Sequence, residues 1–147
     1  MKWFEKDLEI RYVDTDAMGV VHHSVFPVYC EACRIQMLDD IELPYTELEA
    51  AGYYLMVSEF HCRYRAPIRF GDRVFVRTKV TLLKKRLLVF AYELRRRDDN
   101  KLLFTGSSKH LVTHKTDAVV SLPDVYLEKM RAGLTDDPDG MGASQVF

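Results

Sequence analysis

The feature that most constrains the fold is an apolar helical segment at residues 25–40, in a chain whose other segments are mostly strand-like. Ser24 is a suitable N-cap residue, and Pro27 is tolerated in the first helical turn. Apolar residues cover well over half of the circumference of this segment. A helix of about 16 residues spans roughly 24 Å. One this apolar must be wrapped by other structure rather than lie on a surface.

Five segments have the residue pattern of strands. They cover residues 3–13, 53–65, 73–83, 86–97 and 102–115. Turn residues separate the last four, which predicts consecutive hairpins and therefore an antiparallel sheet. A single apolar helix against one antiparallel sheet is an α+β domain, with about five strands wrapped around the long central helix. The open edges of such a sheet are often covered by a second copy of the chain.

The alternation also predicts which side chains share the apolar face of two strands. In the segment 73–83 they are Val74, Val76, Thr78, Val80 and Leu82. In the segment 86–97 they are Leu88, Phe90, Tyr92 and Leu94.

Two shorter helices complete the expected architecture. One covers residues 46–51, and the other begins at Pro123 and runs to about Arg131. We expect one domain over residues 1–133 and a flexible C-terminal tail at 134–147.

The overall composition excludes several classes of function. The formal net charge is −1 over 147 residues, so neither nucleic acid nor a membrane surface is an expected partner. Residues 1–10 are charged and alternating, without the apolar core of a secretory signal. No stretch approaches the roughly 18 apolar residues of a membrane span. We therefore expect a cytoplasmic protein.

The cysteines and histidines do not suggest a disulfide or a metal site. Cys30, Cys33 and Cys62 are an odd number without a secretion signal, which favours free thiols. The C-x-x-C pair lies inside the expected helix, where small buried side chains are a better interpretation than redox chemistry. His110 and His114 would lie about 13 Å apart along a strand, too far for one zinc ion.

Residues 11–23, RYVDTDAMGVVHH, lie directly before the apolar helix and contain two carboxylates, a glycine and two histidines. A helix N-terminus offers free backbone N–H groups and a partial positive charge. An acid or base beside that field is a candidate site for chemistry on a carbonyl group.

This segment closely resembles the D-x-D-x-x-G-x-x-x-H signature of the 4-hydroxybenzoyl-CoA thioesterase-like family, which includes Tol-Pal-associated acyl-CoA thioesterases and has the hotdog fold. Residues 31–34, EACR, resemble the E-A-x-R of that family's central helix. Residues 64–72, YRAPIRFGD, resemble its Y-x-x-P-x-R-x-G-D segment, and the similarity covers about residues 4–132. The resemblance implies an acyl-CoA substrate and homodimers assembled into homotetramers, with active sites at subunit interfaces.

The resemblance also implies roles for individual residues. Asp16 would be the catalytic carboxylate, acting as nucleophile or general base on the thioester. The backbone N–H of His23 would polarise the thioester carbonyl, and the His23 side chain would assist. The sequence HSVF at 23–26 departs from the family's His-x-Asn-Tyr, and His22 replaces a usual aromatic residue. These departures point to a different acyl pocket.

Thioester hydrolysis needs a base or nucleophile, an oxyanion donor and a water-limited pocket, but no metal. Asp16 and the helix N-terminus can supply the first two requirements, and Gly19 permits a close backbone approach between them. The residues expected to bind the substrate are Gly19, Val20, Val21, Phe26, Tyr29, Arg65 and Lys85.

Neighbouring polar residues have simpler interpretations. Asp14 is expected to cap a turn, and His22 to be structural or to line the pocket. Glu31 could be a second acid or base, but a contact with Arg34 or with backbone at the subunit interface is the stronger expectation.

Three basic clusters could bind the phosphates of coenzyme A. They lie at residues 84–86, at residues 95–97, and at Arg63, Arg65 and Arg69. A solvated hairpin rim explains each cluster equally well, and among them we select Arg65 and Lys85.

The sequence therefore predicts an acyl-CoA thioesterase that needs no cofactor beyond the coenzyme A of its substrate. An acyl carrier protein thioester is an alternative substrate. A non-catalytic acyl-thioester binding protein is a second alternative, and a hotdog dehydratase, whose usual His/Asp motif is not found, is a third. The sequence does not identify the acyl group.

Overall fold

A computed structural model describes residues 1–135 of the chain, apart from the side chains of residues 116 and 117. Its strands form one sheet in the order β1-β3-β4-β5-β2, with β6 paired to β5. The strands are β1 (Phe4–Asp7), β2 (Tyr53–Tyr64), β3 (Val74–Leu83), β4 (Leu87–Arg96), β5 (Leu102–His114) and β6 (Thr116–Val119). The helices are α1 (Phe26–Asp40), α2 (Tyr45–Ala50) and α3 (Asp124–Leu134), with 3₁₀ turns η1 (Tyr12–Asp14) and η2 (His23–Val25).

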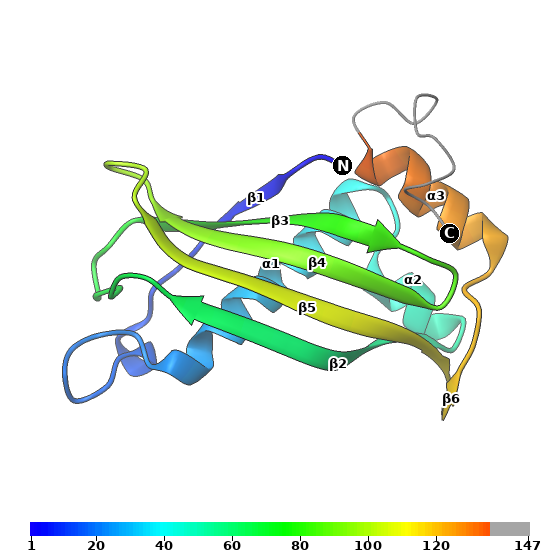
Figure 1. Cartoon of the computed structure of the whole chain (residues 1–147), viewed down its shortest axis with the longest axis horizontal. Helices are drawn as coiled ribbons and strands as arrows, with labels where there is room; N and C mark the ends of the chain where they lie inside the picture. Colours follow the sequence, from blue (N-terminus) through cyan, green and yellow to red (C-terminus); the bar gives the residue numbers. More distant parts are fainter. Residues whose placement is uncertain (136–147) are drawn as a thin grey trace.

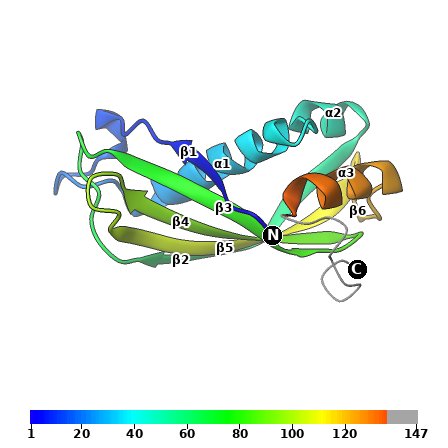
Figure 2. The same cartoon turned by 90° about the horizontal axis from the view of Figure 1, so that it is seen from above.

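Helix α1 lies across one face of the sheet, as Figures 1 and 2 show. Its buried side chains include Cys30, Cys33 and Met37, each 0% exposed, which pack into one cluster with the inner residues of the strands. The expected α+β arrangement of a long apolar helix against an antiparallel sheet is confirmed. All three cysteines are free thiols, and burial raises the pKa of Cys33 to about 12.

The prediction of a hairpin between β2 and β3 is wrong, because the two strands are not neighbours in the sheet. All pairings are antiparallel, but β3 lies between β1 and β4, whereas β2 pairs only with β5 at the other edge. The connection is therefore a crossover around the end of the sheet rather than a tight turn. It buries Ile68 completely, and Arg69 forms a β-bridge with Val20 in the segment before α1. This crossover brings the end of β2 to the start of the helix.

Two local predictions for the strands are also corrected. The first strand ends at Asp7 rather than residue 13, because the chain turns into η1. In β3 the register shifts between Val80 and Leu82, so Leu83 takes the buried position expected for Leu82. The inner face of β4 is confirmed, since its four expected side chains are at most 1% exposed.

The C-terminal helix runs to Leu134, beyond the expected end at Arg131. Leu134 is buried, and its carbonyl accepts the backbone N–H of Lys2 at 3.0 Å. The expected tail at 134–147 lies outside the described residues from residue 136 onward. Within residues 1–135, every helix is too short or too polar to cross a membrane.

Candidate functional site

The segment between η1 and η2 folds into a tight turn around Asp16. The N–H of Asp16 donates to the Val20 carbonyl at 2.8 Å, and the N–H of Gly19 donates to the Asp16 carbonyl at 2.9 Å. Gly19 has a φ of 75°, which glycine adopts without the strain that a Cβ would cause. The Asp16 carboxylate accepts the N–H of Met18 at 2.8 Å. The turn therefore orients the carboxylate but leaves most of its acceptor capacity unused.

Asp14 is the structural carboxylate of the pair, as the sequence predicted. It is 3% exposed, and its oxygens accept the backbone N–H of Arg11 at 3.1 Å, the Arg11 guanidinium at 2.9 Å and the Tyr29 hydroxyl at 2.9 Å. Burial alone would raise the pKa of Asp14, but these hydrogen bonds outweigh it and lower the pKa below its ordinary value of 3.8. Asp14 therefore stays ionised and fixes η1 to α1.

The entry to the helix is capped by His22 rather than by Ser24. The His22 N–H donates to the Asp14 carbonyl at 2.8 Å, and its Nδ1 accepts the Ser24 N–H at 3.2 Å. The cap lies two residues earlier than predicted because the 3₁₀ turn η2 extends the helical segment. The structural role expected for His22 is thus confirmed by its hydrogen bonds.

His23 is held from both sides, yet its own N–H stays available. On its C-terminal side, the Tyr64 hydroxyl donates to the His23 carbonyl at 2.7 Å. On its N-terminal side, His22 is held by Asp14. Among the described residues, none accepts a hydrogen bond from the His23 N–H. A fixed, unpaired N–H beside a helix start is suited to bind a carbonyl oxygen or an oxyanion.

These groups meet in an open pocket of about 390 Å³. Its lining residues are Asp16, Met18, Val20, Val21, His23, Phe26, Tyr64, Arg65, Ala66 and Pro67. The structure thus brings together six of the residues proposed from sequence, with Gly19 in the turn between two of them. Tyr64 was missed as a site residue, although it opens the YRAPIRFGD segment. Its ring packs against Phe26 at 4.9 Å between centroids.

Two residues expected to bind substrate do not line this pocket. Tyr29 is buried, and its hydroxyl is taken by Asp14, so it faces the core instead. Lys85 lies in the β3–β4 turn, at the opposite end of the sheet from the segment before α1 (Figure 1).

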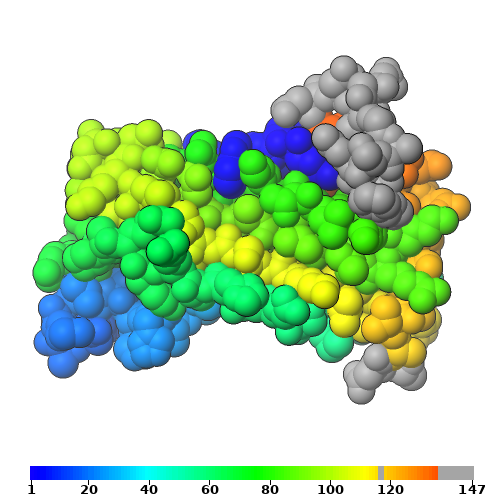
Figure 3. Space-filling model, in the orientation of Figure 1, coloured from blue at the N-terminus to red at the C-terminus, as the bar shows by residue number. Residues whose placement is uncertain are grey.

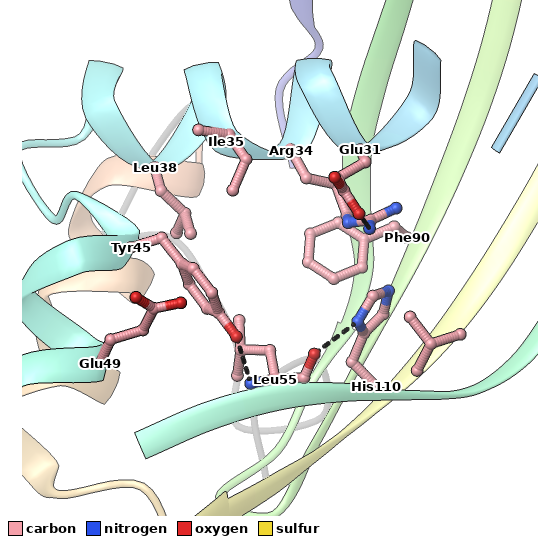
Figure 4. A pocket seen from close by; sticks show the side chains of 10 residues that line it. Glu31, Arg34, Ile35, Leu38, Tyr45, Glu49, Leu55, Phe90 and His110 are labelled. Atoms are coloured by element: carbon pink, nitrogen blue, oxygen red, sulfur yellow. Dashed lines mark hydrogen bonds and ion pairs between the residues drawn. The ribbon is translucent and has the colours of Figure 1, made fainter. Parts of the chain in front are cut away.

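A second cavity, of about 320 Å³, lies farther along α1 and is lined by residues of α1, α2, β2, β4 and β5 (Figure 4). Glu31 and Arg34 both line it, with a long ion pair of 3.8 Å between them, which fits the expected contact. Arg34 donates to the Tyr92 hydroxyl at 2.9 Å. Glu31 thus belongs to a cavity other than the pocket of Asp16.

His110 also lines this cavity, and both of its ring nitrogens form hydrogen bonds. Its Nδ1 lies 3.2 Å from the Leu55 carbonyl, and its Nε2 lies 2.7 Å from the Ser108 hydroxyl. Burial and the nearby Arg34 lower the pKa of His110 to about 4. Since a carbonyl can only accept, the neutral ring donates from Nδ1 and accepts from Ser108 at Nε2. This histidine is a satisfied core residue.

The chain is similar in sequence and in structure to several known proteins. A family model described as the thioesterase-like superfamily matches residues 10–130. The chain is 26% identical over 111 residues to the putative acyl-CoA thioesterase YneP of Bacillus subtilis, covering 76% of this chain and 80% of that protein. It is 30% identical over 91 residues to the acyl-CoA thioester hydrolase YbgC of Escherichia coli, covering 62% and 68%. The structure of the hypothetical protein TT1821 from Thermus thermophilus superposes with a TM-score of 0.84 and 36% identity, covering 92% and 100%.

The role of Asp14 gives a testable pH dependence. The variant Asp14→Asn keeps the shape but loses the charge, and should lower the free energy of unfolding at pH 7 by about 1–3 kcal/mol. Because folding lowers the pKa of Asp14, its contribution is complete above its ordinary value of 3.8 and disappears as the pH falls through the folded-state value.

Urea unfolding of wild type and Asp14→Asn from pH 7 to pH 2 measures this difference. We expect the two free energies to converge below about pH 4. A constant difference across this range would contradict the assigned role.

Proposed function

The chain belongs to the thioesterase-like superfamily, and we propose that it hydrolyses an acyl-CoA thioester to a carboxylic acid and free coenzyme A. The observation that carries this proposal is one pocket containing the Asp16 carboxylate and the start of α1, where the His23 N–H is unpaired among the described residues. The acyl-CoA activity named for two relatives supports the substrate class. Assignment to the 4-hydroxybenzoyl-CoA or Tol-Pal-associated branch stays a prediction.

In the proposed reaction the thioester oxygen accepts a hydrogen bond from the His23 N–H. As the carbonyl carbon becomes tetrahedral, this donor and the positive end of α1 stabilise the oxyanion; such a donor is typically worth about 3 kcal/mol of barrier. Asp16 either attacks the carbon itself or removes a proton from the attacking water. The C–S bond then breaks, and the thiolate of coenzyme A takes up a proton. If Asp16 has attacked the carbon, a water molecule then hydrolyses the mixed anhydride, which releases the carboxylic acid and restores the Asp16 carboxylate.

The walls of the pocket suit an acyl thioester. Val20, Val21 and Phe26 provide apolar surface beside Asp16, and a low-dielectric wall of this kind strengthens electrostatic interactions at a bound carbonyl. His23 lines the same pocket, and its imidazole is proposed to assist proton transfer.

We propose that the active form is a homodimer, assembled further into a homotetramer. Strand β2 forms one edge of the sheet and carries exposed apolar side chains, with Tyr54 and Met56 each 41% and Val57 47% exposed. An apolar strand edge is a surface that a second chain commonly covers.

The mechanism predicts a large loss of activity in Asp16→Asn. Removal of the base or nucleophile should reduce kcat/KM by about 10²–10⁴-fold. Release of free thiol from aromatic, short-chain and long-chain acyl-CoAs measures the rate. Glu31→Gln is the matched control, because Glu31 lines the other cavity and should retain activity within a few-fold.

Activity of Asp16→Asn within a few-fold of wild type would contradict the mechanism. A wild-type protein that releases no thiol from any acyl-CoA would favour an acyl carrier protein substrate or a role in binding alone. Hydration of an enoyl thioester instead of hydrolysis would indicate a dehydratase.

Tyr64 is proposed to position the oxyanion donor. Tyr64→Phe retains the ring packing but loses the hydrogen bond to the His23 carbonyl, so kcat should fall about 5- to 10-fold while KM changes little. Tyr53→Phe removes a hydroxyl from the same strand and serves as the control. An unchanged kcat in Tyr64→Phe would show that the tyrosine does not hold the donor.

A further inference from the structure

The arginines of this chain differ in whether their charges are already neutralised. Five of them, from β3, β4 and the adjoining turns, form ion pairs with carboxylates: Arg73, Arg77, Arg95, Arg96 and Arg97. Arg96, for example, donates to both oxygens of Asp99, at 3.0 and 2.7 Å. These pairs occupy the whole basic cluster at residues 95–97, which lowers its capacity to bind a phosphate.

The end of β2 is different. Arg63 and Arg65 are both exposed, and neither forms an ion pair with any carboxylate that the structure describes. The Arg65 side chain donates from Nε to the Thr105 hydroxyl at 3.2 Å, which leaves its terminal N–H groups available. Arg65 also lines the pocket of Asp16. Two arginine side chains without ion-pair partners among the described residues therefore lie at and beside the rim of the proposed catalytic pocket.

A shallow hollow of about 290 Å³ continues from this rim. Its lining residues are His61, Cys62, Arg63, Thr105, Gly106 and Ser107. Residues Phe104 and Ser108 are buried on the α1 side, so by strand alternation Thr105 and Ser107 point to the opposite face. Arg63 pairs with Thr105 in register, and His61 pairs with Ser107.

The hollow therefore offers guanidinium, imidazole and hydroxyl donors on the outer face of the sheet. Figure 3 shows this face, with the end of β2 beside the N-terminal segment that precedes α1. Arg63 and His61 both line the hollow, and the His61 Nε2 lies 3.6 Å from the carboxylate of Glu59.

We propose that Arg63, Arg65 and this hollow bind the phosphate groups of the coenzyme A portion of the substrate. The inference rests on the proposed function. In an acyl-CoA the pantetheine chain separates the thioester from the phosphates, so the phosphate site must lie at a distance from Asp16. From Arg65, directly after the end of β2, to His61 within the strand, the extended chain covers about 13 Å at roughly 3.3 Å per residue. Phosphate oxygens accept charge-assisted hydrogen bonds from arginine. The planar guanidinium group can donate two of these bonds to one phosphate.

The test compares two substrates that share the acyl group and the thioester. One is the acyl-CoA, and the other is the corresponding acyl-pantetheine, which carries no phosphate. In Arg63→Ala, KM for acyl-CoA should rise about tenfold, whereas kcat/KM for acyl-pantetheine should stay within about twofold of wild type. In Arg65→Ala, whose side chain also lines the pocket of Asp16, KM should rise by a larger factor for acyl-CoA than for acyl-pantetheine. Arg63→Lys should recover part of the loss. Arg96→Ala, which removes an arginine that is already paired, should leave both substrates unaffected.

Equal effects on the two substrates, or none on acyl-CoA, would overturn the inference. A selective rise in KM for acyl-CoA in Lys85→Ala, but not in the Arg63 and Arg65 variants, would move the phosphate site to the β3–β4 turn. If wild type hydrolyses neither substrate, the proposed function fails. Calorimetric titration with free coenzyme A then decides the inference separately: weaker binding by Arg63→Ala and Arg65→Ala supports it, and unchanged affinity refutes it.

Discussion

The site depends on the hydrogen bonds that the buried carboxylate of Asp14 accepts. Its oxygens hold Arg11 on one side and the Tyr29 hydroxyl of α1 on the other, while its backbone carbonyl accepts the N–H of His22. One residue thus connects η1, the helix and the helix cap. The turn that carries Asp16 lies between these anchors, so its position relative to the start of α1 is fixed by Asp14.

Two carboxylates that are two residues apart have different surroundings and therefore different roles. Asp14 is surrounded by donors that favour its ionised form and leave little room for another partner. Asp16 is half-buried at the edge of a pocket and accepts one backbone N–H, which leaves it open to a substrate or a water molecule. The same contrast separates the ion-paired Arg96 from the unpaired Arg65.

Much of the fold could be predicted because it depends on local patterns. The apolar character of α1 and the alternation in β4 are properties of neighbouring residues, and both were identified correctly, although Val28 and Ile35 of the apolar helix are exposed. The crossover between β2 and β3 could not be read in this way, because strand order depends on long-range pairing. The shift at Leu82 follows from a bulge, and the place of Tyr29 follows from a hydroxyl contact with Asp14, fifteen residues away.

The candidate site was predicted mainly through the resemblance of residues 11–23 to a known signature, whereas Tyr64 becomes visible only when the crossover brings β2 to the helix start. The most direct test of the central claim is a crystal structure of the protein bound to an acyl-CoA analogue whose thioester sulfur is replaced by a methylene group. We expect the carbonyl oxygen within hydrogen-bond distance of the His23 N–H, with the carbonyl carbon facing Asp16. A carbonyl bound in the cavity of Glu31 and Arg34 instead would contradict it.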